Sequence, residues 1–410
     1  MAEPSLRFKR DDGSSYPEWK EYALADIMTE RNEPHLITAD APQLSFTIEQ
    51  GVIYPEDKKT NKRDFLMKDK DNKKFLLTEY NDIIYNPANL KFGAIHRNAL
   101  GRGVVSPIYA IFQTSQNPEF IEGIVTNPKF IKSSLKFLEG TVEKLKTLKP
   151  RDFVKMHVWL PCLEEQKRIA GFLSSVDAVI TASEEEVANL ETQKKTAIKK
   201  IFSREVRFKK ADGTNYVEWK SCYRLEEVSD FITKGATPTT YGFDWVEEGI
   251  PFFRNDAIQD NTFVYGDFSY ISEDAHLALS RSEIKNGDIL IAITGEIGKV
   301  GMVPKDILRG NINQHTARIR IVRNYIPYFV YQYLCSDTIQ KSYKKIKTGL
   351  SMAQLSLEQI RSTEIPLVDI EEQRLIVGFL SDFDEAIAAA KKELELWKEL
   401  KKGLLQQMFV

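Results

Sequence analysis

The stretch EEQKRIAGFLSSVDAVITASEEEVANLETQKKTAIKKIF, residues 164–202, decides how this chain of 410 residues is organised, because a second copy follows it. The second copy, EEQRLIVGFLSDFDEAIAAAKKELELWKELKKGLLQQMF, occupies residues 371–409. Both copies begin with EEQ, share GFLS, carry an Asp at the same place and end in Phe, and a constant offset of 207 residues aligns them without a gap. A repeat of this length indicates that the chain contains two related structural units.

Apolar residues recur in both copies at alternating intervals of four and three residues, which is the spacing of a coiled-coil seam. Both copies also place a Lys at the same seam position, where a polar residue fixes the register of pairing. An amphipathic helix of about 58 Å, at 1.5 Å per residue, needs a partner. We expect the two helices to pair with each other; the alternative is that each lies separately over a globular core. The seam positions are Ile169, Leu173, Val176, Ile180, Ser183, Val187, Leu190, Lys194, Ala197 and Ile201, then Ile376, Leu380, Phe383, Ile387, Ala390, Leu394, Trp397, Lys401, Leu404 and Met408.

The composition is that of a globular protein. Apolar residues make up 42% and charged residues 28% of the chain, and the length favours roughly two to four domains. No apolar run reaches the roughly 18 residues of a membrane span, and the first residues lack the apolar core of a signal peptide. Cys162, Cys222 and Cys335 are far apart, and the five His show no metal-ligand spacing. We therefore expect a cytoplasmic protein with no metal site and no cofactor.

The net charge of −2 conceals strong local differences. Residues 51–160 hold 19 Lys or Arg against 12 Asp or Glu, and residues 285–347 hold 11 against 4. Residues 229–284 are acidic, with 3 against 10. Basic stretches on a nearly neutral chain are compatible with a polyanion bound over part of the surface, although most charge runs are only solvated faces.

A second repeat begins each half of the chain. LRFKRDDGSSYPEWKEYALADI at residues 6–27 recurs as VRFKKADGTNYVEWKSCYRLEEV at residues 206–228. In both, a short strand leads to an Asp-Gly turn and then to an aromatic pair. We interpret Trp19 and Trp219 as core residues. These repeats divide the chain into a first domain at 1–160, a long helix at 161–203, a second domain at 204–365 and a long helix at 366–410.

The two regions between the repeats have similar plans and different sequences. Each contains an apolar strand, a loop and then Gly-x-Ile, in DIIYNPANLKFGAIHRN from Asp82 and in DILIAITGEIGKVGMV from Asp288. A helical stretch follows in each region, and a strand then leads through Pro161 or Pro366 towards the long helix. The chain is therefore a tandem duplication with a matching scaffold and divergent interiors, which suggests two different readers at a fixed distance.

Motifs of catalysis are weak or missing. TGEIGKVG resembles a phosphate-binding loop only loosely, because Val300 follows Lys299 where that loop has Ser or Thr. YNPANL is similar to the N-P-P-aromatic loop of amino-methyltransferases, but Ala88 and Asn89 replace the second Pro and the aromatic residue, so an ordinary turn explains it better. We do not expect an independent active site.

The helix block and its preceding segment, residues 161–202 and 366–409, resemble the conserved regions of the specificity subunit of Type I restriction-modification systems. FITKGATPTT, TGEIGKVG and NINQHTARI, and YNPANLKFGAIHRN with VVSPIYAIF, resemble motifs of that family's target-recognition domains. The resemblance covers nearly the whole chain. It implies an α+β fold in which two mixed α/β target-recognition domains stand in tandem, each followed by a long helix, and the helices pair as an antiparallel coiled coil with pseudo-two-fold symmetry.

The resemblance also implies a function without catalysis in this chain. Each domain would read one half of a bipartite site in double-stranded DNA, and the helices would set the spacing and dock two methyltransferase subunits that carry S-adenosylmethionine. ATP-dependent restriction subunits would join this core. The alternatives are a two-domain protein-interaction scaffold that does not bind DNA directly, and a stand-alone DNA-modifying enzyme.

Contacts to DNA are expected from basic and polar loop residues, through salt-dependent phosphate contacts and hydrogen bonds to base edges. The family gives no residue-by-residue code, and for each candidate the alternative is an ordinary exposed loop residue. The candidates are Lys91, His96, Arg97, Asn98 and Arg102 in the first domain, and Lys234, Thr237, Thr239, Arg254, Asn255, Thr294, Lys299 and His315 in the second.

Overall fold

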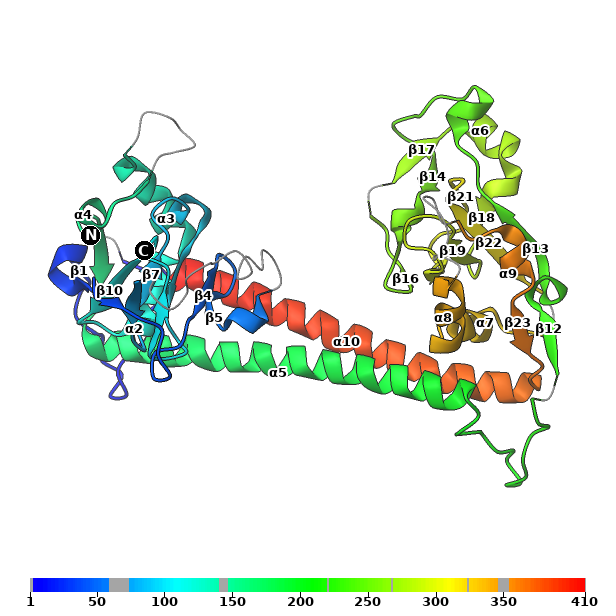
Figure 1. Cartoon of the computed structure of the whole chain (residues 1–410), viewed down its shortest axis with the longest axis horizontal. Helices are drawn as coiled ribbons and strands as arrows, with labels where there is room; N and C mark the ends of the chain where they lie inside the picture. Colours follow the sequence, from blue (N-terminus) through cyan, green and yellow to red (C-terminus); the bar gives the residue numbers. More distant parts are fainter. Residues whose placement is uncertain are drawn as a thin grey trace. The chain divides into compact units, whose positions relative to one another are not determined.

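A computed structural model describes residues 3–58, 74–139, 147–219, 221–266, 268–322, 324–345 and 354–409. The chain forms two compact units (Figure 1): unit 1 consists of residues 1–184 and 392–410, and unit 2 of residues 185–391. These units divide each long helix between them, whereas the sequence repeats suggest boundaries at the helix ends. The reason is that residues near both ends of each helix enter a core. Ile169 and Met408 belong to the core of unit 1, and Ile201 and Ile376 to that of unit 2.

Unit 1 is made of short strands, as its β-branched and aromatic residues between frequent Gly and Pro predict. Its central antiparallel sheet has the order β2-β10-β7-β8, and β3-β6-β9 form a smaller sheet. The helices are α1 (Leu24–Ile27), α2 (Pro118–Val125), α3 (Pro128–Ser134) and α4 (Pro150–Phe153). The strands are β1 (Lys20–Ala23), β2 (Met28–Glu30), β3 (Pro34–His35), β4 (Ser45–Thr47), β5 (Gly51–Ile53), β6 (Phe75–Thr78), β7 (Ile83–Tyr85), β8 (Ile95–Arg97), β9 (Gly103–Val105), β10 (Ala110–Thr114) and β11 (His157–Leu160).

Unit 2 holds two four-stranded sheets, β13-β22-β19-β20 and β17-β14-β21-β18. Its helices are α6 (Glu273–Ala278), α7 (Pro327–Leu334), α8 (Asp337–Lys345) and α9 (Leu357–Arg361). Its strands are β12 (Cys222–Arg224), β13 (Ser229–Lys234), β14 (Ile250–Phe253), β15 (Ile258–Gln259), β16 (Thr262–Phe263), β17 (Ser269–Ile271), β18 (Glu283–Ile284), β19 (Ile289–Ala292), β20 (Val300–Met302), β21 (Gly310–Ile312), β22 (Thr316–Ile321) and β23 (Glu364–Pro366).

The duplication seen in the sequence extends to the sheets. The order β2-β10-β7-β8 of unit 1 corresponds strand for strand to β13-β22-β19-β20 of unit 2, and the pair β1-β11 corresponds to β12-β23. The remaining sheets differ: β3-β6-β9 is antiparallel throughout, while β14 and β21 pair in parallel. The shared part of the fold is therefore the central sheet and the strand pair beside the long helix.

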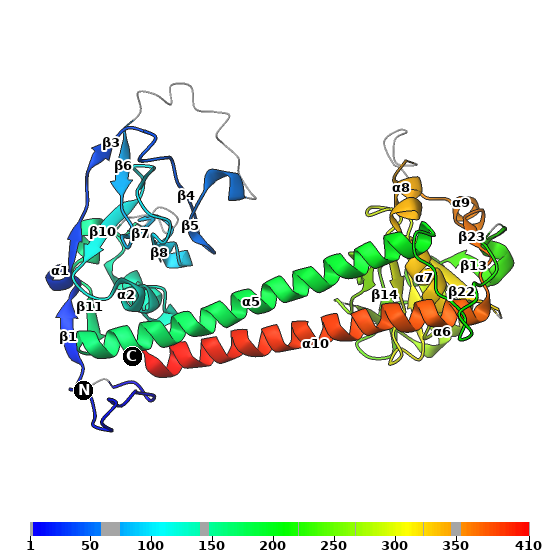
Figure 2. The ribbon, with the colours of Figure 1, turned by 90° about the horizontal axis from the view of Figure 1, so that it is seen from below.

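The long helices are α5 (Leu163–Phe202) and α10 (Ile370–Met408). All the seam positions predicted from the sequence are buried or half-buried. Within each unit the two helices lie side by side and run in opposite directions, because residue numbers rise along one helix as those of their partners fall along the other (Figure 2). The ion pairs are Lys398–Glu184 (2.8 Å) and Lys401–Asp177 (2.5 Å) in unit 1, and Lys391–Glu191 (2.7 Å) and Lys194–Asp384 (2.5 Å) in unit 2.

The repeated Glu of EEQ is a buried ion-pair partner. Glu165 and Glu372 have no exposed surface. Glu165 lies 2.8 Å from Arg7, and Glu372 lies 2.6 Å from Arg207. The Arg side chains come from the RFK segments that begin each half, so each ion pair fastens the start of one half to a long helix. Trp219 donates a further hydrogen bond of 2.8 Å to Glu372.

The repeated Gln of EEQ connects a long helix to a short one. The Gln166 side-chain oxygen accepts from the backbone N–H of Asn117, just before α2, and its amide donates to the Pro161 carbonyl. Gln373 accepts in the same way from the backbone N–H of Ile326, just before α7. Both Gln side chains are fully buried. An otherwise unpaired N–H group near each helix start is thereby satisfied, which gives a structural reason for this part of the repeat.

The tryptophans predicted to be core residues are buried: Trp19 is 4% exposed and Trp219 is 3% exposed. Trp19 packs edge-on against Phe120, and Trp219 packs in the same way against Phe329. Within the described ranges, no helix is both long and apolar enough to cross a membrane.

Candidate nucleic-acid interface

Loops gather at one edge of the central sheet of unit 2. The antiparallel pairing of β22 with both β13 and β19 brings the ends of β13 and β19 next to the start of β22. Residues from three distant parts of the sequence therefore meet at this edge. Those that the sequence analysis selected are Lys234, Thr237, Thr294 and His315.

Hydrogen bonds connect these loops in what we name the unit 2 polar cluster, consisting of Thr237, Gln314, His315 and Thr294. The Thr237 hydroxyl donates to the Gln314 side-chain oxygen. The Gln314 amide nitrogen lies 3.3 Å from His315 Nε2, and His315 Nδ1 lies 2.9 Å from the Thr294 hydroxyl. If Nε2 accepts from Gln314, Nδ1 carries the proton and donates to Thr294. Gln314 is exposed and the other three are half-buried, so the cluster presents donors and acceptors on a partly fixed surface.

The backbone beneath the cluster is tightly constrained. A Cβ atom on Gly235 would lie 1.9 Å from the Ile312 carbonyl oxygen, so only glycine fits where the two segments cross. Asn313, which is 7% exposed, accepts hydrogen bonds from the His315 backbone N–H at 3.1 Å and from the Thr316 hydroxyl at 3.2 Å. A site held by buried supporting contacts presents its side chains with little freedom.

Asn255 and Arg254 lie on a further segment of unit 2. The Asn255 amide nitrogen is 3.6 Å from the point where a Cβ on Gly295 would stand, so it borders the loop that follows Thr294. Arg254 is exposed, donates to the Ser269 hydroxyl at 3.2 Å and lies 5.8 Å from the Trp245 ring centre. Thr239 is also exposed, two residues beyond Thr237.

Lys299 lines a groove instead of joining the polar cluster. Its ammonium lies 3.2 Å from Asp260 and 3.9 Å from Glu296. The groove has a volume of about 920 Å³ and lies between the unit 2 halves of α5 and α10, α7, α8 and the β15-β16 hairpin. Five other lysines and four carboxylates line it, so it is a weakly basic surface of a different kind from the polar cluster. The five lysines are Lys194, Lys195, Lys199, Lys344 and Lys391.

In unit 1, His96 and Arg97 on β8 both face Glu122 of α2. The Arg97 guanidinium lies 3.1 Å from Glu122 and donates to Asn81 at 2.9 Å. His96 lies 3.8 Å from Glu122 through Nδ1 and 2.8 Å from the Ile48 carbonyl through Nε2. Burial alone would raise the pKa of Glu122, but the contact with His96 and the hydrogen bonds from the backbone and side chain of Arg97 outweigh it and hold this pKa below its ordinary value. Both basic residues are therefore already engaged by a carboxylate.

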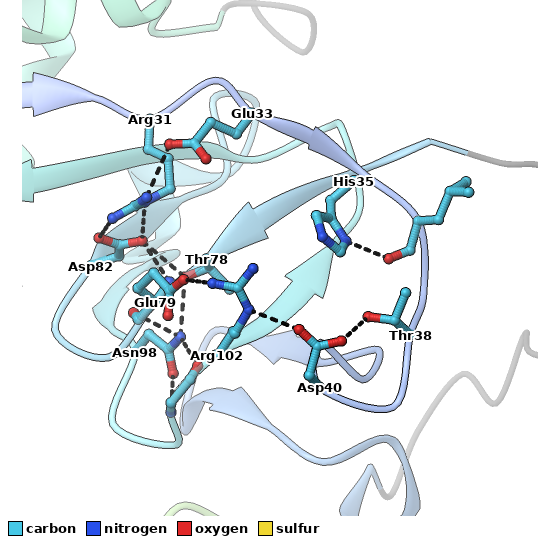
Figure 3. A network of polar contacts seen from close by, with 12 residues as sticks. Arg31, Glu33, His35, Thr38, Asp40, Thr78, Glu79, Asp82, Asn98 and Arg102 are labelled. Carbon is cyan, nitrogen blue, oxygen red and sulfur yellow. Dashed lines mark hydrogen bonds and ion pairs between the residues drawn. The ribbon is translucent and has the colours of Figure 1, made fainter.

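Asn98 and Arg102 belong to a second network in unit 1 (Figure 3). Asn98 has no exposed surface, and its amide donates to the Thr78 hydroxyl and to the Glu79 and Gly101 carbonyls. This burial corrects the expectation of a DNA contact from Asn98, because the side chain is used to shape the loop. Arg102 is exposed and pairs with Glu79 and with Asp40.

The same network includes a buried ion pair that the sequence did not reveal. Arg31 lies 2.8 Å from Asp82, which also accepts from the Glu79 backbone N–H at 2.7 Å (Figure 3). Burial raises the pKa of Asp82 despite this pairing. Lys91 is half-buried nearby in sequence, with its ammonium 5.2 Å from the Phe92 ring centre.

Gln314 and its support Asn313 are further residues that the sequence analysis did not select. Both lie in the NINQHTARI segment that had been singled out, between two apolar strands. A run of polar residues between strands was the available signal, but it could not tell the exposed Gln314 from the buried Asn313.

Comparison with protein families identifies this architecture. The family described as "Type I restriction modification DNA specificity domain" matches residues 216–396. Residues 216–396 are therefore similar to the specificity domain of Type I restriction-modification systems. For this region the match supports the resemblance seen in the sequence, and DNA specificity is the role that the family's description gives.

Individual relatives agree with this assignment. The chain is 25% identical over 282 residues to the putative type I restriction enzyme MjaX specificity subunit of Methanocaldococcus jannaschii, covering 67% of this chain and 63% of that protein. It is 28% identical over 237 residues to the EcoBI specificity subunit of Escherichia coli, covering 53% of this chain and 49% of that protein. The matches thus span about half to two-thirds of the relatives' own length.

Solved structures share the fold. A Type I restriction-modification S subunit from M. genitalium aligns with a TM-score of 0.57 at 16% identity, covering all of this chain and 99% of the other. A chain from a study of complex assembly and conformational transition of the type I R-M system gives the same TM-score at 18% identity, covering 96% of this chain and 98% of the other. The mixed α/β fold with its long C-terminal helix is therefore that of known specificity subunits.

Proposed function

We propose that this chain is the specificity subunit of a Type I restriction-modification system and reads a bipartite site in double-stranded DNA, one half with the target-recognition domain at 1–160 and the other with that at 204–365. The unit 2 polar cluster carries the proposal. Gln and Asn can form two hydrogen bonds with adenine in the major groove, and Thr can contact any base edge. Gln314 and Asn255 bring such groups to one sheet edge from distant parts of the chain.

Basic residues would add phosphate contacts that carry no sequence information. In unit 2 we assign this role to Lys234, Arg254 and Lys299, and in unit 1 to Lys91 and Arg102. Thr239 would extend the unit 2 cluster. His96 and Arg97 would have to exchange contacts with Glu122 for contacts with DNA, while Asn98 would hold the loop in place.

The helix segments at 161–203 and 366–410 would form an antiparallel coiled coil that sets the distance between the two readers. The buried seam positions and the antiparallel ion pairs in each unit support this part of the proposal. A helix of 40 residues measures about 60 Å at 1.5 Å per residue, which is compatible with readers placed in separate major grooves.

Two methyltransferase subunits would dock on the repeated GFLS motif. Phe172 and Phe379 are 38% and 40% exposed. A glycine inside the long helix precedes each of them. A Cβ atom on Gly171 or Gly378 would meet nothing within 4 Å. Glycine inside a helix costs about 1 kcal/mol relative to Ala, and the packing within this chain does not require it. A partner that approaches the helix backbone closely at both places would require glycine there.

ATP-dependent restriction subunits would join this core, which would act in the cytoplasm where the DNA is. The methyl transfer and the DNA cleavage would belong to those partner subunits. The specificity subunit would contribute positions, distances and base contacts, and would need no cofactor of its own.

The test of DNA reading uses the full chain with its methyltransferase partners and a duplex chosen by sequencing methylated adenines in the host genome. Gln314→Ala is expected to weaken cognate binding by about 1–3 kcal/mol and leave binding to unrelated DNA almost unchanged. Lys299→Ala, the matched control for a phosphate contact, should weaken both and reduce the salt dependence. Unchanged discrimination in Gln314→Ala, with melting as in the wild type, would contradict this assignment.

The test of docking counts methyltransferase subunits per chain. Phe172→Glu and Phe379→Glu are each expected to leave one bound subunit, and the double variant none. Leu396→Glu, at a helix position that is 57% exposed outside the repeated motif, should keep two. Binding of partners without any binding of DNA would favour the alternative, a protein-interaction scaffold.

A further inference from the structure

The ion pairs between α5 and α10 are of two kinds. In the first kind, a seam Lys meets an Asp of the other helix, as in Lys194–Asp384 and Lys401–Asp177. The repeat offset of 207 residues relates Lys194 to Lys401 and Asp177 to Asp384. Each helix therefore carries one Lys and one Asp of this kind at matching positions.

In the second kind, both acidic residues lie on α5 and both basic residues lie on α10. Glu191 lies 2.7 Å from Lys391, and Glu184 lies 2.8 Å from Lys398. The same offset relates residue 184 to 391 and residue 191 to 398. At these matching positions α5 has Glu twice and α10 has Lys twice.

We propose that the Glu pair of α5 and the Lys pair of α10 make each helix select the other helix of its own chain and reject the same helix of a second copy. If α5 paired with α5 in this register, Glu184 would face Glu191 twice. If α10 paired with α10, Lys391 would face Lys398 twice. The seam pairs would survive either exchange, because Lys194 would meet Asp177 and Lys401 would meet Asp384. Only the Glu and Lys pairs distinguish the partners.

The spacing of the apolar seams does not provide this discrimination. The two seams have the same spacing and the same length, and no gap separates them in alignment. Two chains that exchanged helices would keep the spacing of the apolar seam and the seam ion pairs. In coiled coils, charges that flank the apolar seam decide partner choice, and like charges placed against each other act as negative selection.

Each Glu–Lys pair of the second kind is weak on its own. Its side chains are 42–56% exposed, and exposed ion pairs are screened by water and salt. Their number matters more than their strength. Two chains hold four attractive contacts when each pairs internally and would hold four repulsive contacts after exchange. If each contact shifts the equilibrium about twofold, the combined preference is on the order of a hundredfold.

The consequence depends on the proposed function, although the pairing preference itself does not. Under the proposed function, internal pairing would hold the unlike readers of one chain at a fixed distance. Exchanged pairing would place two copies of one reader at that distance, so the assembly would recognise a palindrome in place of a bipartite site.

The experiment exchanges one charge between the helices. In the full-length double variant E191K/K398E, both internal contacts become repulsive, whereas α5 with α5 and α10 with α10 gain Glu–Lys contacts. The net charge stays the same. The matched control is the quadruple variant E184K/E191K/K391E/K398E, in which all four charges are reversed and internal pairing remains attractive.

Chains with two different tags are expressed together, and recovery of one tag with the other is measured alongside mass by sedimentation. We expect the ratio of two-chain to one-chain species of E191K/K398E to rise about ten-thousandfold over that of the wild type at low salt, because a preference on the order of a hundredfold is reversed, and the quadruple variant to match the wild type. Salt of about 1 M, where the screening length is about 3 Å, should reduce the difference. Equal two-chain fractions in all three proteins, or equal increases in both variants, would overturn the proposal. Absence of DNA binding by the wild type with its methyltransferase partners would count against the proposed function and leave this inference intact.

Discussion

The two units share a scaffold and differ at the edge where DNA would be read. Both have the same central strand order and the same buried Glu–Arg pair on a long helix. In unit 1 the candidate arginines are tied to carboxylates, as Arg97 is to Glu122. In unit 2 the polar candidates such as Thr237 and His315 bond mainly to one another. They lie where β19 ends, whereas Arg97 pairs with the first residue of β7, at the opposite end of its sheet. The shared sheet and the Glu–Arg pair can therefore stay the same while the surfaces proposed to contact DNA change. The reason is that few residues of those surfaces stabilise the shared sheet.

The largest effect is expected from the buried Glu–Arg pairs. Glu165→Ala should cost about 3–5 kcal/mol, because it leaves Arg7 without its buried partner. Glu372→Ala should cost about 1 kcal/mol more, since the Trp219 N–H also loses its acceptor. Hydrogen exchange in β1 and β12 would report each unit separately. The exposed neighbours Glu164→Ala and Glu371→Ala serve as controls, and equal losses in all four variants would contradict the account.

A medium effect, of opposite sign, is expected at Arg318. It is fully buried in β22, its Nε and Nη2 atoms have no hydrogen-bond partner among the described residues, and burial lowers its pKa to about 10. Unit 1 has Ile111 at the equivalent position, opposite Ile84 as Arg318 is opposite Leu290. Arg318→Leu should therefore stabilise unit 2 by about 2 kcal/mol. Arg318 Nη1 donates to the Glu283 carbonyl, and the guanidinium lies 4.2 Å from the Phe231 ring centre. Thermal unfolding would measure the change, and a lower melting temperature would show that these contacts outweigh the cost of burying the charge.

The smallest effect is expected on the stability of unit 1 at low pH. The pKa of Glu122 is below its ordinary value in the folded chain, so its stabilising contribution is complete above the unfolded value of about 4.3 and is lost as the pH falls through the folded value. Unit 2 has Tyr331 at the equivalent helix position, counted from the Gln contacts before α2 and α7. Hydrogen exchange below about pH 4 should show unit 1 opening before unit 2.

Glu122→Gln should reduce the stability of unit 1 at neutral pH and make it less dependent on pH in the acid range. Glu119→Gln is the control, because its side chain is 42% exposed and lies 3.6 Å from Arg97. An acid transition in unit 1 that stays the same in Glu122→Gln would mean that other carboxylates control it.

Repetition made much of the fold predictable from the sequence. The long helices, their seams and the buried tryptophans could be predicted because each leaves a periodic or duplicated pattern. The reason for the EEQ repeat could not be predicted. Glu165 contacts Arg7, and Gln166 contacts the backbone of Asn117, only after the chain has folded.

The candidate site was only partly predictable. Sequence selected Thr237, Thr294 and His315 as loop residues, but it could not show that pairing of β22 with its neighbours brings them together. It also treated Asn98 and Lys299 alike. One is a buried amide that shapes a turn and the other lines a basic groove, and this distinction depends on burial, which a single loop sequence does not reveal.

Spacing provides the most direct test of the central claim that the two helices set the distance between two DNA readers. Seven residues inserted into both α5 and α10, as one matched heptad each, would lengthen the pair by about 10.5 Å at 1.5 Å per residue. At about 3.4 Å per base pair, the preferred spacer between the half-sites should increase by about three base pairs, measured by selection from a library of duplexes with varied spacers. A spacer preference identical to that of the wild type, in a variant that still binds both half-sites, would contradict the account.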